Sequence, residues 1–423
     1  MNDFTTELLT LEEILVQHNS LKAAYFHAKV NARLSESSLR LLKERLIVIL
    51  RHYQSLSFEC LNLFSKYEKN SKEFLLNLIV LAILRYEKNS DAEAVMQAYR
   101  ETMSQLRLSM DFNGGKELLL NACKAPFVIP DEIKKAPVVY NSLVLEIPDF
   151  LLRSLSEDFG NTDALSIALS LHGNCSHYLV KTNKEDSSLL KEEGLEPIHL
   201  SAQNVLYKVN KNFSSQDKKE KGLLPISYLE ACALNRVNLP SIAPNVLICN
   251  SKSTSLYRYL SACVSSSYDG KVVPVFDSSL SYRLCMDAVK KEKITNVYPL
   301  LAKSNLMKTY LSFDEFDLVV SCSDDSKTGM ARRYVEILPS LSSKEFFKPN
   351  QKQEEELQDA SLFVKEGGYL LFISYALNKR ENVDVVAKFL KENKKFALQN
   401  QEFLFPDKTE QEGGYYALLR RTA

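Results

Sequence analysis

The chain has 423 residues, of which 45% are hydrophobic and 25% are charged, and this balance excludes an intrinsically disordered protein. Lysine and arginine together number 53, as do aspartate and glutamate, so no net charge draws the whole chain toward nucleic acid. No apolar run approaches the ~18–20 residues that a membrane-spanning helix needs, and the length suffices for two or three domains.

Residues 1–140 are predicted to form an all-α domain, because apolar residues recur three and four positions apart through most of this stretch. The longest apolar stretch, Phe74–Leu84, is expected to be a buried helix. Asp91 is placed to cap a helix, and Thr10 with Glu13 has the spacing of a capping box. A packing or docking role is the expectation for this domain.

Prolines between positions 126 and 137 mark a boundary, after which residues 141–212 are expected to form a small mixed α/β subdomain. Its predicted elements are helices over Pro148–Phe159 and Thr162–Leu171 and a strand near Tyr178–Thr182.

Short apolar strands alternate with helical segments in the remainder, residues 213–423. The predicted strands are Val246–Cys249, Val272–Phe276, Leu318–Ser321 and Tyr369–Ser374. Alternation of this kind is typical of the α/β class, with a parallel, doubly wound sheet and crossover helices.

Motifs in the last third of the chain resemble one known family. The clearest are Gly413–Arg420, Val364–Leu370, Glu381-Asn382 and Thr328–Arg333, with a weaker match at Pro148–Leu151. In order and almost without gaps they are similar to motifs of the RsmB/Sun family of ribosomal RNA cytosine-5 methyltransferases. The resemblance implies a Rossmann-like S-adenosylmethionine methyltransferase domain that follows an N-terminal NusB-like helical domain.

Both catalytic positions of that family hold other residues. The family uses one cysteine thiolate to attack carbon 6 of cytosine and a second cysteine to release the product. Alignment places the attacking cysteine at Tyr375 and the helper at Asp325. A phenol is mostly protonated near neutrality and a carboxylate is a poor partner for this addition. Cys322 is a weak substitute, since it stands where the family has an aspartate, and we interpret it as a buried or rim cysteine.

The cofactor loop of the family aligns with Ile248–Leu256, which contains no glycine. Glycines let a backbone approach a ligand closely, so their loss argues against a tight S-adenosylmethionine site. Asp277 ends the second strand and is placed to accept hydrogen bonds from ribose hydroxyls, although a solvated aspartate fits this position equally well.

Candidate RNA contacts come from two segments. Lys181 and Asn183 resemble the family's R-V-N strand, and the guanidinium groups of Arg332 and Arg333 could bind phosphates. A solvated surface is the alternative for the arginine pair, and the sequence leaves both open.

No metal site is predicted, because the spacing of His172, Cys175 and His177 matches no common zinc pattern. The eight cysteines form no C-x-x-C pair, and the chain begins without a signal-peptide pattern, so reduced thiols in the cytoplasm are expected. Ribosomal RNA or a ribosome-assembly partner is expected, without DNA or a membrane, and the oligomeric state is not defined.

The leading hypothesis is therefore a catalytically inactive pseudo-methyltransferase that binds RNA, a ribosome-assembly intermediate or a protein. The first alternative is an active S-adenosylmethionine-dependent RNA methyltransferase with a rearranged site that uses Cys322. The second is a structural interaction protein that acts through its helical domain.

Overall fold

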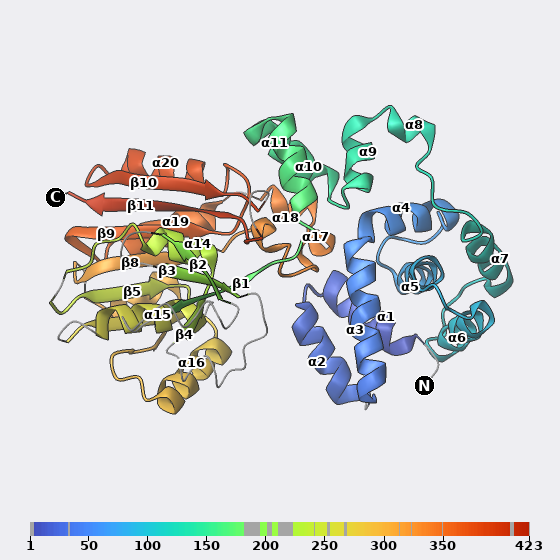
Figure 1. The fold of residues 1–423 in the computed structure, drawn as a ribbon, viewed down its shortest axis with the longest axis horizontal. Coiled ribbons are helices and arrows are strands. Elements are labelled where there is room, and N and C mark those ends of the chain that lie inside the picture. The colour runs from blue at the N-terminus through green and yellow to red at the C-terminus, as the bar shows by residue number, and fades with distance from the viewer. Residues whose placement is uncertain are drawn as a thin grey trace. The chain divides into compact units, whose positions relative to one another are not determined.

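A computed structural model gives the fold of the chain (Figure 1). It describes residues 4–32, 34–181, 195–200, 205–209, 223–240, 242–251, 254–265, 269–312, 314–322, 324–348, 350–406 and 410–422. The chain divides into two compact units, each of which combines separate stretches of sequence. We call residues 1–172 with 331–346 the helical unit, and residues 173–330 with 347–423 the sheet unit.

The helical unit contains α-helices and no strand among its described residues. Its helices are α1 (Thr5–Leu15), α2 (Leu21–Ala32), α3 (Glu36–Arg51), α4 (Tyr53–Leu63), α5 (Lys72–Tyr86), α6 (Ala92–Gln105), α7 (Phe112–Ala122), α8 (Asp131–Lys134), α9 (Pro137–Val144), α10 (Asp149–Phe159), α11 (Asn161–Ser170), α17 (Ile337–Ser340) and α18 (Ser343–Phe346). The predicted all-α character of the N-terminal region is confirmed.

Short polar side chains start several of these helices. Asp91 accepts a hydrogen bond from the Glu93 amide at 3.0 Å, which confirms it as the N-cap of α6. The capping box predicted at Thr10 is wrong, because Thr10 lies inside α1 and its hydroxyl donates to the Thr6 carbonyl at 2.7 Å. The Thr10 hydroxyl therefore bonds to a backbone carbonyl inside the helix and does not cap a helix start.

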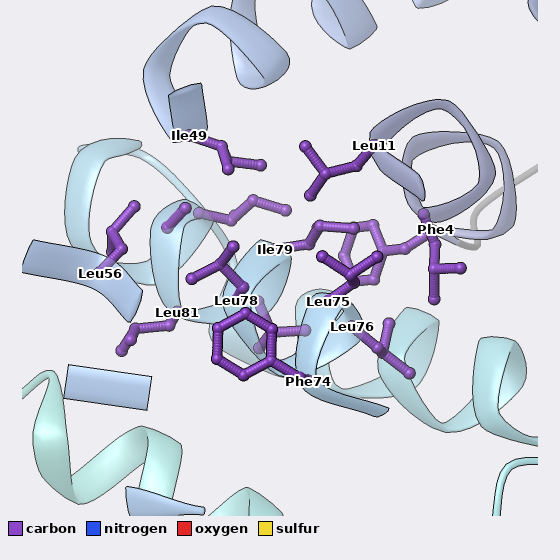
Figure 2. Packing of buried hydrophobic residues seen from close by; sticks show 14 of the residues in the cluster. Phe4, Leu11, Ile49, Leu56, Phe74, Leu75, Leu76, Leu78, Ile79 and Leu81 are labelled. Carbon is purple, nitrogen blue, oxygen red and sulfur yellow. The ribbon is translucent and has the colours of Figure 1, made fainter. Parts of the chain in front are cut away.

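Helix α5 forms the centre of the helical unit, and its core side chains are drawn in Figure 2. Every residue from Phe74 to Ile83 is buried. A helix that is apolar on all sides is stable only when other helices surround it, and its neighbours α1, α3, α4 and α6 supply that surface. The predicted buried helix over Phe74–Leu84 is confirmed.

Residues 331–346 leave the sheet unit and pack into the helical unit. A carboxylate oxygen of Glu336 accepts a hydrogen bond from the Leu21 amide, 3.0 Å away, at the start of α2. The Ser340 hydroxyl lies 3.3 Å from the Ile14 carbonyl, near the end of α1. The segment that follows the T-G-x-x-R-R motif is thus part of the helical core rather than a loop of the sheet.

The sheet unit carries two sheets and their covering helices. Its elements are β1 (His177–Lys181), β2 (Leu195–His199), β3 (Val205–Val209), β4 (Leu223–Ile226), α14 (Tyr228–Leu234), β5 (Asn245–Cys249), α15 (Thr254–Ser265), β6 (Lys271–Phe276), α16 (Ser279–Glu292), β7 (Leu300–Leu301), the 3₁₀ turns η1 (Ser304–Thr309) and η2 (Thr328–Met330), β8 (Phe316–Cys322), α19 (Gln351–Ser361), β9 (Val364–Ser374), α20 (Val383–Glu392), β10 (Phe396–Leu404) and β11 (Gly414–Arg421). A four-stranded antiparallel sheet has the order β2-β3-β1-β4.

The larger sheet has seven strands in the order β10-β11-β9-β8-β5-β6-β7. Strands β9, β8, β5, β6 and β7 are parallel, whereas β11 runs antiparallel to both of its neighbours. The prediction of an α/β, Rossmann-like fold is confirmed. The strand order reverses at β5, and in sheets of this class ligands bind beyond the carboxyl ends of the strands near such a point.

Alternating side chains of the central strands enter two separate hydrophobic clusters. Ile248 of β5 packs in a cluster with α15 and α16, whereas its neighbour Leu247 packs in a cluster with α19 and α20. Successive side chains of a strand point to opposite faces, so a continuous apolar strand needs helices on both sides. None of the described helices combines the length and the apolarity that crossing a bilayer requires.

Candidate functional site

The carboxyl ends of β5, β6 and β8 and the residues that follow them are here called the carboxyl edge. Tyr375 follows the last residue of β9, beside this edge, and its side chain is half-buried. Its phenol oxygen lies 2.8 Å from the Ser227 hydroxyl. Burial, and the charges of Glu230 and Glu412, raise the pKa of the phenol well above its ordinary value. A phenol in this setting stays protonated, so it cannot act as the nucleophile that a thiolate would be.

Asp325 lies against Tyr375. One carboxylate oxygen accepts the Tyr375 amide at 2.7 Å, and the other accepts the Lys327 amide at 2.8 Å. The structure therefore brings the two catalytic positions of the family together, which the sequence alignment implied but could not measure. Both side chains are engaged with the protein itself, and neither carries sulfur.

A second carboxylate, Glu381, shapes the electrostatics of Asp325. Burial, followed by the charge of Glu381, raises the pKa of Asp325 to about 6, although the amides of Tyr375 and Lys327 act in the opposite direction. Glu381 itself accepts hydrogen bonds from the Ser326 amide at 2.9 Å and the Ser326 hydroxyl at 2.7 Å. These acids hold the chain between β8 and η2 against the turn after β9.

The raised pKa of Asp325 predicts a pH-dependent loss of stability. An unfolded aspartate ionises near pH 4, and the folded one only near pH 6, so the folded state holds more protons between these values. Stability should fall as pH rises from 4 to 6, by roughly 1–3 kcal/mol from this group. Asp325→Asn should show a smaller fall, measured as the difference in urea midpoint between pH 4 and pH 7. An unchanged pH dependence in the variant would contradict the assignment.

Cys322 and Asp277 also lie at the carboxyl edge. Cys322 is the last residue of β8, is half-buried and remains outside any disulfide. Its charge, if ionised, would act on both Cys249 and Tyr375. Asp277 is the first residue after β6 and is exposed. The structure thus places both residues at the edge, as predicted, without assigning either a ligand.

The residues after β5 do not fit an adenosyl cofactor well. Asn250 has a positive φ of 52°, and both it and Ser251 are buried. The Ser251 hydroxyl has no hydrogen-bond partner in the described part of the chain. The buried side chains of Asn250 and Ser251 occupy space that a glycine would leave free for a ligand. Residues 252 and 253 lie outside the described residues.

Two acids that sequence reasoning missed surround the Tyr375 phenol. Glu230 is buried, and its carboxylate lies 3.4 Å from the Ser255 hydroxyl in the first turn of α15. Burial raises its pKa, and the charge of Glu412 adds to this effect. Ser227 and Glu230 form a capping box at the start of α14, with both reciprocal hydrogen bonds present. The S-x-x-E spacing was the available signal, but it pointed to a helix start and not to the site.

The predicted RNA contacts Arg332 and Arg333 belong to the helical unit, although they follow Asp325 closely in the sequence. Arg332 is half-buried in the helical unit, where its Nε donates a hydrogen bond to the Ser170 carbonyl at the end of α11. Arg333 is likewise half-buried in that unit. Lys181 ends β1, but its side chain and the whole of Asn183 lie outside the described residues.

The described residues of the carboxyl edge contain no cluster of metal-ligating side chains. Across the described residues, no group of three histidine, cysteine, aspartate or glutamate side chains is arranged to hold a metal ion. His172 instead lies 3.0 Å from the Glu146 carbonyl. Two cavities of about 410 and 290 Å³ lie in the helical unit, and Arg45 contributes to the lining of both.

Comparisons with known proteins agree with this fold. The sequence model of a family described as 16S rRNA methyltransferase RsmB/F matches residues 284–420. The crystal structure of PH0851 is 17% identical, with a TM-score of 0.77 over 99% of this chain and 98% of its own. A methyltransferase homolog protein from Pyrococcus horikoshii is 14% identical, with a TM-score of 0.55 over 67% of this chain and 99% of its own. No curated protein matches in sequence. The two structures show that the fold is shared, and the first extends that likeness to the whole chain.

Proposed function

We propose that this chain is a pseudo-methyltransferase that binds RNA without methylating it, because residues 284–420 match the model of the 16S rRNA methyltransferase family RsmB/F. Ribosomal RNA, free or in an assembly intermediate, is the proposed partner, because the matching family acts on it. The helical unit is proposed to be NusB-like, and the cytoplasm is the proposed location.

One observation carries the proposal of inactivity. At the two positions aligned with the catalytic cysteines, the Tyr375 phenol pairs with the Ser227 hydroxyl and the Asp325 carboxylate accepts the Tyr375 amide, and neither group can attack carbon 6 of a pyrimidine. S-adenosylmethionine, when bound, would supply the methyl group, but a donor alone does not activate carbon 5. The fold can persist without this chemistry, since packing requires only apolar patterning whereas catalysis requires particular atoms.

A methyl-transfer assay tests the proposal. The purified protein is incubated with small-subunit ribosomal RNA transcribed in vitro and S-adenosylmethionine labelled on its methyl group. We expect no 5-methylcytosine above the level of a reaction without protein. Labelled 5-methylcytosine in the RNA would refute the proposal. Loss of that product in Cys322→Ser would then identify the alternative, an active enzyme with a rearranged nucleophile.

RNA binding is tested at the proposed contacts, for which Lys181, Asn183, Arg332 and Arg333 remain candidates. The double variant Arg332→Ala, Arg333→Ala should bind small-subunit ribosomal RNA roughly three- to tenfold more weakly, with a salt dependence reduced by about two phosphate contacts. Fluorescence anisotropy at several salt concentrations measures both quantities. Lys344→Ala, an exposed change in the same segment, is the matched control. Equal affinity of the double variant and the control would remove the arginines from the interface.

Thermal melting must accompany this comparison, because Arg332→Ala also removes a hydrogen bond to the Ser170 carbonyl. If the double variant melts much lower than the wild type, Arg333→Ala alone provides the binding measurement.

A further inference from the structure

A lysine from the first turn of α19 contributes a positive charge to the carboxyl edge. The Nζ atom of Lys352 lies 2.7 Å from a carboxylate oxygen of Asp324 and 3.7 Å from one of Glu356. Its ammonium pKa is raised by Asp324, by Glu356 and also by Asp277. Asp324 and Glu356 therefore pair with the ammonium group, and the charge of Asp277 also acts on it.

The ion pair with Asp324 places the ammonium beside the end of β8. Asp277 directly follows β6, and Asp324 follows β8, while β5 lies between these two strands. Glu356 is one helical turn beyond Lys352, and its charge also acts on Cys249, the last residue of β5. Lys352 therefore holds its charge at the carboxyl edge beside the end of β8, and sheets of this class bind nucleotide ligands at this edge.

A positive charge at this position is unfavourable for the cofactor that the family resemblance implies. S-adenosylmethionine carries a positively charged sulfonium, which Lys352 would repel. The carboxylate of S-adenosylmethionine would compete with a carboxylate of the protein. The start of α15, where the helix dipole favours an anion, already has the Glu230 carboxylate beside Ser255. The turn after β5 adds side-chain bulk and no glycine.

We propose that Lys352 is a built-in cation that replaces a cationic ligand at the carboxyl edge, so that the chain disfavours S-adenosylmethionine relative to the uncharged thioether S-adenosylhomocysteine. This inference rests on the proposed function, since a working methyltransferase must bind the sulfonium form. The two ligands share the adenosine, the amino group and the carboxylate, so the ratio of their affinities reports the charge at sulfur. The side chain of Lys352 is 63% exposed, and water therefore limits the effect to roughly fivefold.

Titration calorimetry with both ligands tests the proposal on the full chain. The wild type should bind S-adenosylhomocysteine roughly fivefold more tightly than S-adenosylmethionine. Lys352→Met keeps most of the length of the side chain but removes its charge, which leaves the negative charges of Asp324 and Glu356 unneutralised. Its preference should reverse toward S-adenosylmethionine.

Lys388→Met is the matched control. Lys388 of α20 is a similarly exposed lysine, and it pairs with Glu354 of α19, the helix that also carries Lys352. Lys388→Met therefore removes a comparable ion pair at another position. The control should keep the wild-type ratio. An unchanged ratio in Lys352→Met, or no binding of either ligand by either protein, would overturn the proposal. Appearance of S-adenosylmethionine binding only in Lys352→Met would support it.

Failure of this inference is distinct from failure of the proposed function. Methylated RNA produced by the wild type would refute the pseudo-methyltransferase, whatever the calorimetric ratio. An unmethylated RNA with an unchanged ratio in Lys352→Met would refute only the role of Lys352.

Discussion

Replacing Gly329 with alanine should destabilise the sheet unit by about 3 kcal/mol. The Gly329 amide donates to the Tyr375 carbonyl at 2.8 Å, and the Gly329 carbonyl accepts the Gly413 amide at 2.8 Å. A methyl group on Gly329 would lie 2.8 Å from the Tyr375 carbonyl oxygen and closer still to the carbonyl of Gly413. Both neighbours are backbone, which cannot rotate away, so three chain segments must separate to admit one carbon atom.

Hydrogen exchange of the β8 and β9 amides measures this effect, because a chain with two units need not unfold in one step. Gly367→Ala is the control: no atom lies within 4 Å of the added carbon there, but the positive φ of 74° should cost about 1 kcal/mol. Equal losses in the two variants would show that backbone conformation, rather than crowding at Gly329, determines the cost.

Apolar patterning was sufficient to predict the central strands β5, β6, β8 and β9 of the larger sheet and the buried helix α5, but not β7, β10 and β11. Val246–Cys249 and Leu318–Ser321 are short, continuously apolar runs, and such runs are buried whatever surrounds them. The burial of α5 followed in the same way, because an apolar stretch of that length has few alternatives.

The excursion of residues 331–346 into the helical unit could not be read from the sequence. The contacts that hold it, such as Glu336 with the Leu21 amide, join positions 315 residues apart. Glu336 pairs with the backbone amide of Leu21, and every residue except proline has such an amide. The residue type at position 21 therefore gives no signal of this contact.

The surroundings of Tyr375 show the same limit at the candidate site. Resemblance located Tyr375 and Asp325, but not Ser227, whose hydroxyl meets the phenol across 148 residues. Nothing in the sequence singled out Lys352, because its spacing to Glu356 is that of any ion pair on a helix surface. Sequence reasoning located the two positions that align with the family's cysteines, whereas the groups around them depend on tertiary contacts.

Glu146→Ala should destabilise the helical unit by about 2–3 kcal/mol. Helix α4 begins after His52, which provides no side-chain cap, and Glu146 fills that role from far along the chain. One of its carboxylate oxygens accepts the amides of Gln54 at 3.0 Å and Ser55 at 3.1 Å. The other accepts the Ser55 hydroxyl, and the side chain is only 13% exposed. Truncation leaves these half-buried donors at the positive end of the helix dipole without their carboxylate acceptor.

Two further variants separate capping from a general loss of charge. Glu146→Gln keeps an acceptor oxygen but not the charge, so it should lose about half as much stability as Glu146→Ala. Glu157→Ala removes an exposed glutamate of α10 in the same unit and should stay within about 0.5 kcal/mol of the wild type. Hydrogen exchange of the first α4 amides, together with urea unfolding, measures the three variants. If Glu146→Ala protects these amides as well as the wild type does, the carboxylate is not the cap of α4.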